Sequence, residues 1–433
     1  MDTTATALAI VEQLTGTEGR ADPYPLYEQA RRLGPVAPLS DSFVLVSGYA
    51  EVNRLLRDPG FGVVDGAVLD AWWASQSGQP EGSEQSAQPD GSGGPARQRE
   101  PDSAALLGQS ILQANQPRHA RMRAPIASVF TPRRVAALEP AVSAVVDALL
   151  DELAELGADG APVDFMEQVA YRLPVGVICE LLGVPERDRH LFRPLGHELS
   201  RALEFAPGQD DLGSADEAAR ELSGYFTRLA AERRAEPRDD LVSALVGLTG
   251  GDGARLTDAE LIGNLVLLLV AGFETTTNLL GNGLAAVFAH PKVRSALQEG
   301  ALPAADLVEE VLRYDSPVQL TSRVALREGL DVGGVPLPRY GEVLLLIGAA
   351  NRDPARFPEP DRFDPWRADV QPLSFGAGAH YCLGAMLARL EATLAFRALF
   401  ARFPGLAPAP GVEPVRNDRL LLRGYATLPV VLG

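Results

Sequence analysis

Apolar residues recur at three- and four-residue spacing through the middle of the chain, in "AALEPAVSAVVDALLDELAEL" (136–156), "GVICELLGV" and "SGYFTRLAAERR". This period is typical of helices with one buried face. Near the N-terminus, "PVAPLS" and "DSFVLVSG" are short apolar runs joined by a polar turn and bounded by Pro35 and Gly48, a pattern that predicts two strands. The C-terminal third mixes a strand-like run, "EVLLLIGAA" (342–350), with helices and prolines. We therefore predict a mainly α-helical protein with a small β-rich lobe.

The longest predicted helix covers "LTDAELIGNLVLLLVAGFETTTNLLGNGLAAVFAHP" (256–291) and begins with a capping box at Thr257 and Glu260. It spans roughly 50 Å, long enough to cross the molecule. Ala271, Glu274 and Thr275 interrupt its apolar character and share one face. Two interpretations stay open: a kink caused by a hydroxyl that bonds back to the helix, or a site where a flat cofactor or diatomic ligand approaches a proton-transferring acid and alcohol.

Composition and charge narrow the function classes. Of the 433 residues, 46% are hydrophobic and 22% are charged, which is ordinary for a globular protein, and the net charge is −18. This charge opposes binding to nucleic acid or to an anionic membrane. The longest apolar run, of about 13 residues, falls short of the roughly 20 that span a bilayer. Two cysteines, Cys179 and Cys382, fit a reducing compartment, so we expect a cytoplasmic protein without a membrane anchor.

One segment, 75–103, is rich in Ser, Gly, Gln and Pro and has no apolar pattern. Trp72 and Trp73 stand side by side directly before it. The segment is either a tolerated surface insertion or a lid with an aromatic tip, since loops of this length in compact proteins are often functional.

The ten residues "FGAGAHYCLG", Phe375 to Gly384, hold three glycines, His380 and Cys382 directly before an apolar helix. The unpaired N–H groups of a helix N-terminus lower a thiol pKa, and glycines let the backbone fold around the sulfur. From these residues alone four readings stay open: a structural cysteine, a nucleophile with His380 as its base, a zinc ligand, or the thiolate ligand of a haem iron. By contrast, Cys179 lies on an apolar helix and is expected to serve packing.

The complete pattern is more specific. Phe375, Gly378, His380, Cys382 and Gly384 reproduce the signature F-x-x-G-x-[HR]-x-C-x-G, and the chain closely resembles a cytochrome P450. This resemblance implies that the cofactor is haem b and that Cys382 is the axial ligand of its iron. It also implies that Phe375, Gly376 and Gly384 shape the loop around the cofactor and that His380 reaches a haem propionate.

Three further motifs carry the same resemblance. "AGFETT" matches [AG]-G-x-[DE]-T-T of the long central P450 helix, which implies that Ala271 lies beside the haem and that Thr275 and Glu274 act in oxygen activation and proton supply. Glu310 and Arg313 match E-x-x-R, and Arg362 in "FPEPDRFDP" would complete a structural triad. "HARMR" matches H-x-x-x-R, so His119 and Arg123, together with Arg323, would hold the propionates.

The resemblance implies a single P450 domain over 1–433 with an unusually long variable loop at about 62–110. The implied reaction inserts one oxygen atom of O2 into a C–H or C=C bond of a hydrophobic small molecule, with electrons from ferredoxin and ferredoxin reductase. The chain resembles actinobacterial biosynthetic P450s that act on macrolides and other secondary metabolites. The expected substrate contacts are Trp72, Trp73, Leu106, Leu107, Ala271, Phe273, Val318 and Leu320.

Rival functions remain at this point. The same scaffold could catalyse oxidative coupling or use peroxide, and a haem-binding sensor or carrier is a candidate from another class. Glu274 and Thr275 argue against a sensor or carrier, because a binder needs no proton relay. We also expect exposed arginines near the cysteine, among them Arg121 and Arg134, to dock an acidic ferredoxin.

Overall fold

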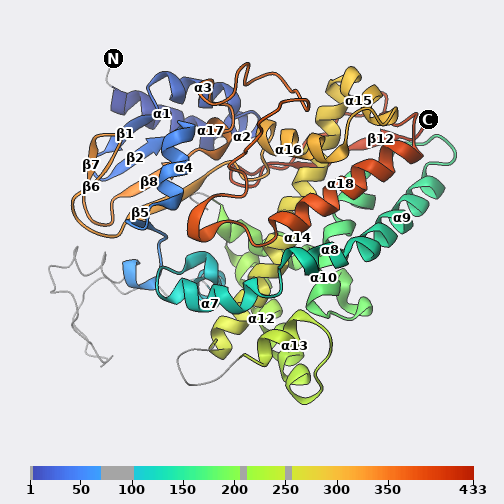
Figure 1. Cartoon of the computed structure of the whole chain (residues 1–433), viewed down its shortest axis with the longest axis horizontal. Helices are drawn as coiled ribbons and strands as arrows, with labels where there is room; N and C mark the ends of the chain where they lie inside the picture. The colour runs from blue at the N-terminus through green and yellow to red at the C-terminus, as the bar shows by residue number, and fades with distance from the viewer. Residues whose placement is uncertain (1–2, 70–101, 205–211, 249–255) are drawn as a thin grey trace.

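A computed structural model describes residues 3–69, 102–204, 212–248 and 256–433. Helices make up most of it, and a small twisted sheet lies at one side together with the N-terminal helices (Figure 1). The architecture is therefore the predicted one, mainly helical with a β-rich lobe.

The helices have the following bounds: α1 Thr3–Thr15, α2 Thr17–Ala21, α3 Tyr24–Arg32, α4 Tyr49–Arg57, α6 Asp102–Gly108, α7 Arg118–Ala127, α8 Pro132–Ala137, α9 Glu139–Leu156, α10 Arg172–Leu182, α11 Phe192–Leu199, α12 Gly213–Ala235, α13 Leu241–Val246, α14 Asp258–Ala289, α15 Pro291–Gln298, α16 Ala304–Tyr314, α17 Ile347–Ala350 and α18 Ala385–Arg402. Short helical turns lie at η1 Ile111–Gln113, η2 Met166–Ala170, η3 Glu186–Leu191, η4 Ser200–Leu203 and η6 Gly378–His380.

The main sheet has the order β1-β2-β8-β5-β3, in which β2 and β8 are parallel and the other neighbours are antiparallel. The remaining strands form three small sheets, β4-β12-β9, β10-β11 and β6-β7. The strand bounds are β1 Val36–Ser40, β2 Phe43–Val46, β3 Phe61–Gly62, β4 Val163–Asp164, β5 Thr321–Ala325, β6 Leu330–Val332, β7 Val335–Leu337, β8 Glu342–Leu345, β9 Ala407–Pro408, β10 Val415–Arg416, β11 Tyr425–Thr427 and β12 Pro429–Val431.

Side-chain alternation along the strands buries both faces of the main sheet. On β2, Val44 and Val46 join a core that includes α4, while Leu45 between them joins a core with α1 and α3. A third and much larger core lies among the helices, from α6 to α18.

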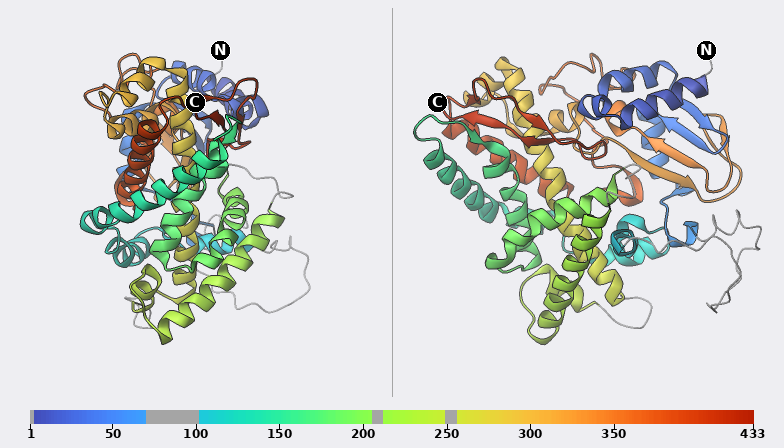
Figure 2. Two further views of the ribbon diagram at one scale, coloured as in Figure 1. Left: turned by 90° about the vertical axis from the view of Figure 1, so that its right-hand side faces the viewer. Right: turned by 180° about the vertical axis from the view of Figure 1, so that it is seen from behind.

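Helix α14 runs through the middle of the molecule in all three views (Figures 1 and 2). It begins with the predicted capping box: Thr257 Oγ1 accepts from the Glu260 amide at 3.1 Å, and Glu260 Oε2 accepts from the Thr257 amide at 3.0 Å. In the described ranges it is the one helix long and apolar enough to cross a membrane. However, 78% of its most apolar window is buried within the protein, as in the core helix of a globular protein.

Two predicted elements differ in detail. The 136–156 helix is divided at Leu138 into α8 and α9, because Pro140 has no N–H to continue the first helix and instead occupies the first turn of the second. The 342–350 run is β8 only as far as Leu345 and then turns into the short helix α17. In the predicted variable region 62–110, residues 70–101 lie outside the described part, and Trp72 and Trp73 lie among them.

Candidate functional site

The loop before α18 is folded tightly around Cys382. The Cys382 amide donates to the carbonyl oxygen of Phe375 at 3.0 Å, which closes the loop. Gly376 and Gly378 adopt φ values of +66° and +68°, which favour glycine. A Cβ on Gly378 would lie 2.4 Å from the carbonyl oxygen of Leu56 on α4, so this glycine also lets the loop pack on α4. The conformation of the loop therefore explains why glycine stands at positions 376 and 378.

Cys382 keeps some surface open to solvent although the surrounding fold encloses its thiol, and the amides of Gly384 and Ala385 at the start of α18 donate to its sulfur. Burial within the fold raises the pKa of the thiol, and these amides with the charges of Arg123 and Arg389 lower it by less. A lowered thiol pKa was expected at this helix N-terminus. The amides donate to the sulfur as expected, but desolvation outweighs their effect on the pKa. The other cysteine, Cys179, is buried in the core, which raises the pKa of its thiol to about 12, in agreement with a packing role.

Four nitrogen-bearing side chains converge beside the loop. The rings of His119 and His380 lie 4.2 Å apart, and the charges of Arg123 and Arg323 act on His380. Burial, followed by these neighbours, lowers the pKa of His380 to about 3, and burial lowers the pKa of Arg323 to about 10. Such a cluster of donors favours an anionic partner.

The polar contacts of these four residues leave room for that partner. Nε2 of His119 is buried without a hydrogen bond, and Arg123 donates to the carbonyl oxygen of Tyr381. Arg323 donates to the Ser322 carbonyl at 2.7 Å and to Thr321 Oγ1 at 3.4 Å. In the ranges that the structure describes, none of the four forms an ion pair with a carboxylate. The residues fit a ligand that brings its own carboxylates next to the sulfur of Cys382.

The burial of α14 is interrupted near its centre. Ala271 is exposed, although the ten residues before it are all buried. Thr275 Oγ1 donates to the Ala271 carbonyl at 3.0 Å, so the back-bonded hydroxyl considered from sequence is present, yet the helix continues without a break. Glu274 is 4% exposed and its Oε1 lies 3.2 Å from Nδ1 of His197 on α11. A small residue, a buried acid and an alcohol thus lie within five positions on a core helix, at Ala271, Glu274 and Thr275.

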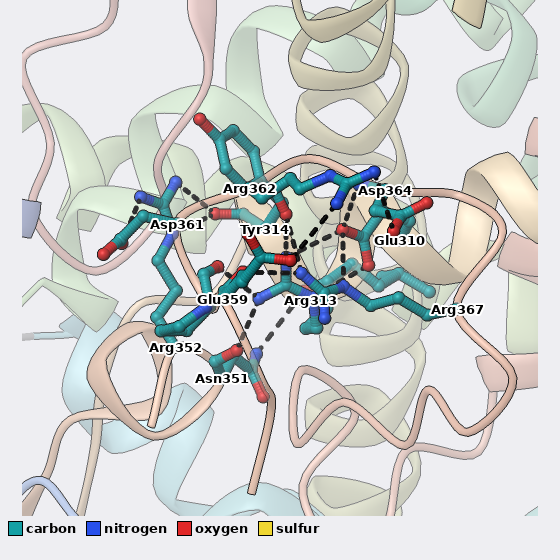
Figure 3. A network of polar contacts seen from close by, with 12 residues as sticks. Glu310, Arg313, Tyr314, Asn351, Arg352, Glu359, Asp361, Arg362, Asp364 and Arg367 are labelled. Atoms are coloured by element: carbon teal, nitrogen blue, oxygen red, sulfur yellow. Dashed lines mark hydrogen bonds and ion pairs between the residues drawn. The ribbon is translucent and has the colours of Figure 1, made fainter. Parts of the chain in front are cut away.

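Glu310 and Arg313 form a pair that is entirely buried (Figure 3). Arg313 Nε lies 2.8 Å from one oxygen of Glu310, and Nη2 lies 2.7 Å from the other. Arg313 also donates to the carbonyl oxygens of Asn351, Pro360 and Arg362. The pair is therefore far from the exposed and weak contact that is usual at this spacing on a helix.

The prediction that the side chain of Arg362 completes the triad with Glu310 and Arg313 is wrong. The guanidinium of Arg362 is 60% exposed and contacts Glu359 and Asp364, and only its carbonyl oxygen meets Arg313. Arg367 supplies the third side chain instead: its Nε lies 3.4 Å from Glu310 Oε1 (Figure 3). In addition, Asn351 of the "NRDP" segment accepts from the Leu373 amide and donates to Ser374 Oγ, which ties the network to the start of the cysteine loop.

The expected substrate contacts divide by burial. Ala271 is exposed, and Leu106 and Val318 are half-buried. Leu107, Phe273 and Leu320 are each at most 2% exposed inside a hydrophobic core, so we do not carry them forward as proposed contacts. Leu107 packs among the helices, Phe273 faces Gly196 on the side of α14 opposite to Ala271, and Leu320 packs with the N-terminal helices.

Sequence reasoning did not find His197, Arg367 or Arg419. Arg419 Nη1 donates to Ser200 Oγ at 2.7 Å, and Nη2 donates to the carbonyl oxygen of His197 at 2.9 Å. The partners of His197 and Arg419 are more than 70 positions away in the chain, and no spacing rule connects them. The only available signal for His197 was the scarcity of histidine, of which the chain has five.

Comparison with known proteins decides what this arrangement is. The sequence profile of the cytochrome P450 family matches residues 200–427. Cytochrome P450 monooxygenase PikC of Streptomyces venezuelae is 39% identical over 96% of this chain and 92% of its own length. This chain belongs to the cytochrome P450 family.

Two further P450 relatives cover almost the whole chain. The 6-deoxyerythronolide B hydroxylase of Saccharopolyspora erythraea is 36% identical over 98% of this chain and all of its own length. The ligand-free crystal structure of CYP164A2 from Mycobacterium smegmatis superposes with a TM-score of 0.83 and 36% identity, and the match covers 98% of this chain and all of that one. The protein is thus a P450 monooxygenase that uses haem b, and its predicted fold class and family are confirmed.

Proposed function

We propose that Cys382 is the axial ligand of the haem iron and that His119, Arg123, Arg323 and His380 bind the haem propionates. The observation that carries this proposal is the cluster of four nitrogen-bearing side chains, with a buried Nε2 on His119 that has no partner and no carboxylate paired to the cluster in the described ranges. Phe375, Gly376 and Gly384 would then shape the loop, with Phe375 covered by the Arg389 guanidinium, 4.5 Å from its ring centroid.

Glu274 and Thr275 are proposed as the catalytic residues. The bound haem supplies the activation of O2 and the transfer of one oxygen atom to the substrate. Ala271, which carries only a methyl group, leaves space for small ligands beside α14. Thr275 holds its hydroxyl against the Ala271 carbonyl, and Glu274 keeps a proton-exchanging carboxyl next to it in a place largely shielded from solvent.

The proposed substrate is a hydrophobic secondary metabolite of the macrolide or polyketide kind, which the enzyme hydroxylates or epoxidises. Support comes from the near full-length similarity to PikC and to a 6-deoxyerythronolide B hydroxylase. The remaining candidate contacts, Leu106, Ala271 and Val318, are apolar. The haem protein can be titrated with macrolactones, terpenoids and small aromatics while the Soret band is recorded. Macrolactones should produce the Soret shift that reports a change of the iron from low to high spin. A shift with another class of compound alone contradicts this substrate.

Isotope labelling separates the proposed reaction from its rivals. With labelled O2 and reducing equivalents, one labelled oxygen atom should appear in the product. Oxidative coupling would leave the product without label, and peroxide-driven turnover would take its oxygen from peroxide in the absence of O2.

The proposed electron donor is a ferredoxin with its reductase, docked near α8. The guanidinium of Arg121 already binds both oxygens of Glu260, at 2.9 and 2.6 Å, so the proposal rests on α8. Arg133 and Arg134 are exposed on α8, which packs against α18, the helix that follows the cysteine loop.

Exchange of both arginines (R133E/R134E) should slow reduction by an acidic ferredoxin at least tenfold, an effect that high salt diminishes. Reduction by dithionite should not change, which controls for the haem site itself. An unchanged rate with ferredoxin would remove α8 from the docking surface.

A further inference from the structure

His197 is held against Glu274 by the close crossing of α11 over α14. Gly196, next to His197, faces Phe273, next to Glu274; a Cβ on Gly196 would lie 2.4 Å from Cε1 of Phe273. The absence of a side chain at Gly196 lets the two helices approach at this point. As a result, Nδ1 of His197 lies 3.2 Å from Oε1 of Glu274.

The contacts of the imidazole assign its hydrogen. Arg419 Nη2 lies 3.4 Å from Nε2 of His197, and a guanidinium can only donate, so Nε2 is the acceptor. In the neutral ring the hydrogen is then on Nδ1, where it donates to the carboxylate of Glu274. Arg419 also bonds the His197 carbonyl and Ser200 Oγ, which fixes the end of α11 and the orientation of the ring.

The two side chains differ in their access to water. The side chain of Glu274 is 5% exposed, whereas that of His197 is 38% exposed. A buried carboxylate exchanges protons slowly with solvent unless a second group connects it, and imidazole is the side chain best suited to that task near neutral pH.

We propose that His197 is the positioning residue of Glu274, which orients the carboxylate through Nδ1 and supplies it with protons taken up at Nε2. This inference rests on the proposed role of Glu274. A solvent hydronium ion gives a proton to Nε2, and the imidazolium gives its Nδ1 proton to Glu274. The ring then loses its Nε2 proton to water and regains one from water at Nδ1, which restores the starting tautomer. No redox change occurs in this transfer.

Other charged and titratable groups lie around the pair in the described ranges. Burial and the charge of Glu274 raise the pKa of Tyr171 to about 12. Arg193 lies over the ring of Tyr171 and is paired with Glu167, and the charge of Asp164 also acts on this tyrosine. Arg419 contacts His197 itself, and arginine keeps its charge throughout.

The first test does not depend on turnover. In the diamagnetic ferrous–CO holoprotein, ¹⁵N NMR reports the ring tautomer of each of the five histidines, and the His197→Gln variant assigns the signals of His197. The wild-type ring of His197 should show the pattern of an Nδ1–H tautomer, and replacement of Glu274 by Gln should change that pattern, because it removes the carboxylate that accepts the Nδ1 hydrogen. Replacement of the exposed His190 on η3 by Gln should leave the His197 signals unchanged. Unaltered His197 signals in the Glu274→Gln variant would overturn the proposal.

The second test uses turnover. His197→Gln keeps a hydrogen-bond donor but cannot take up a proton. The fraction of electrons that reaches product should therefore fall at least fivefold, with a matching rise in hydrogen peroxide. This fraction should also lose its pH dependence between pH 5.5 and 8. The rate of first reduction should stay the same, and His190→Gln should behave as wild type. A purely structural role would leave the pH profile unchanged. If the NMR signals of His197 respond to Glu274→Gln as expected but the protein has no monooxygenase activity, the proposed function is contradicted and the contact between His197 and Glu274 is still supported.

Discussion

At the residue scale, Arg313 and Arg362 differ in how much burial each guanidinium experiences, and therefore in how much each ion pair contributes to stability. Arg313 and Arg362 are both arginines in apparently suitable motifs, but Arg313 is completely buried and Arg362 is 60% exposed. The motif spacing correctly joined Glu310 to Arg313, because three residues separate neighbours on one helix face. It could not distinguish Arg362 from Arg367, since both follow in the same irregular segment, and the backbone path alone decides which guanidinium turns inward.

Glu391 on α18 is a buried carboxyl whose Oε2 has no hydrogen bond. Burial raises its pKa from an ordinary 4.5 to about 8. Between these pH values the folded state holds a proton that the unfolded chain has lost, so the free energy of unfolding must fall as the pH rises from about 4.5 to 8. Glu391→Gln removes this loss. The difference in the free energy of unfolding between the variant and the wild type should therefore grow in favour of the variant by as much as about 4 kcal/mol from pH 5 to pH 9.

Urea unfolding at several pH values measures this effect. The exposed Glu413→Gln variant is the matched control and should follow the wild-type curve. Parallel pH curves for wild type and Glu391→Gln would mean that Glu391 is ionised in the folded protein.

At the element scale, the regular elements followed from the sequence and the contacts between them did not. The 3.6-residue period predicted α9, α10, α12 and α14, and the capping box placed the start of α14 correctly. Phe273 shows the limit: it is close in sequence to Ala271, but it lies on the opposite side of the helix and packs on Gly196. Which side of a uniformly apolar helix faces a ligand depends on the neighbouring helices, and periodicity gives no signal when all sides are buried.

The cysteine loop offers a matched pair of glycines. Gly376 and Gly378 have nearly the same positive φ, but a Cβ on Gly376 meets nothing closer than 3.9 Å, whereas one on Gly378 would lie 2.4 Å from the Leu56 carbonyl oxygen. Gly376→Ala should therefore cost only the backbone strain, about 1 kcal/mol. Gly378→Ala should cost clearly more and lower the haem content, because backbone atoms of α4 must move. Thermal unfolding and the haem-to-protein ratio measure both effects; equal behaviour of the two variants would contradict this packing argument.

The Glu310 network connects α16 to the segment that leads into the cysteine loop. Arg313→Leu leaves Glu310 as a buried charge without its main partner and should destabilise the protein by about 3–5 kcal/mol. Arg362→Leu removes an exposed guanidinium and should cost less than about 1 kcal/mol. Denaturant unfolding with haem quantification compares the two, and a similar loss in both would restore Arg362 to the network.

At the scale of the whole molecule, four short motifs were enough to predict the P450 fold, the haem cofactor and the monooxygenase class. They succeeded because each encodes a local requirement: glycines for a tight loop, small and polar residues on a core helix, a charged pair within one helical turn, and a histidine and an arginine one turn apart. The pairing of α11 with α14 through His197 and Glu274 joins residues 77 positions apart, which no local requirement specifies. The substrate depends on such long-range arrangements and was correspondingly harder to predict.

The central claim is that Cys382 binds the haem iron through its sulfur. The most direct measurement is the ferrous–CO absorption spectrum of the purified haem protein beside that of Cys382→Ser, with Cys179→Ser as the matched control. We predict the red-shifted Soret band of a thiolate-ligated haem in the wild type and in Cys179→Ser, and its loss in Cys382→Ser. A red-shifted band that survives in Cys382→Ser, or its absence from a wild-type protein with full haem content, would contradict the account.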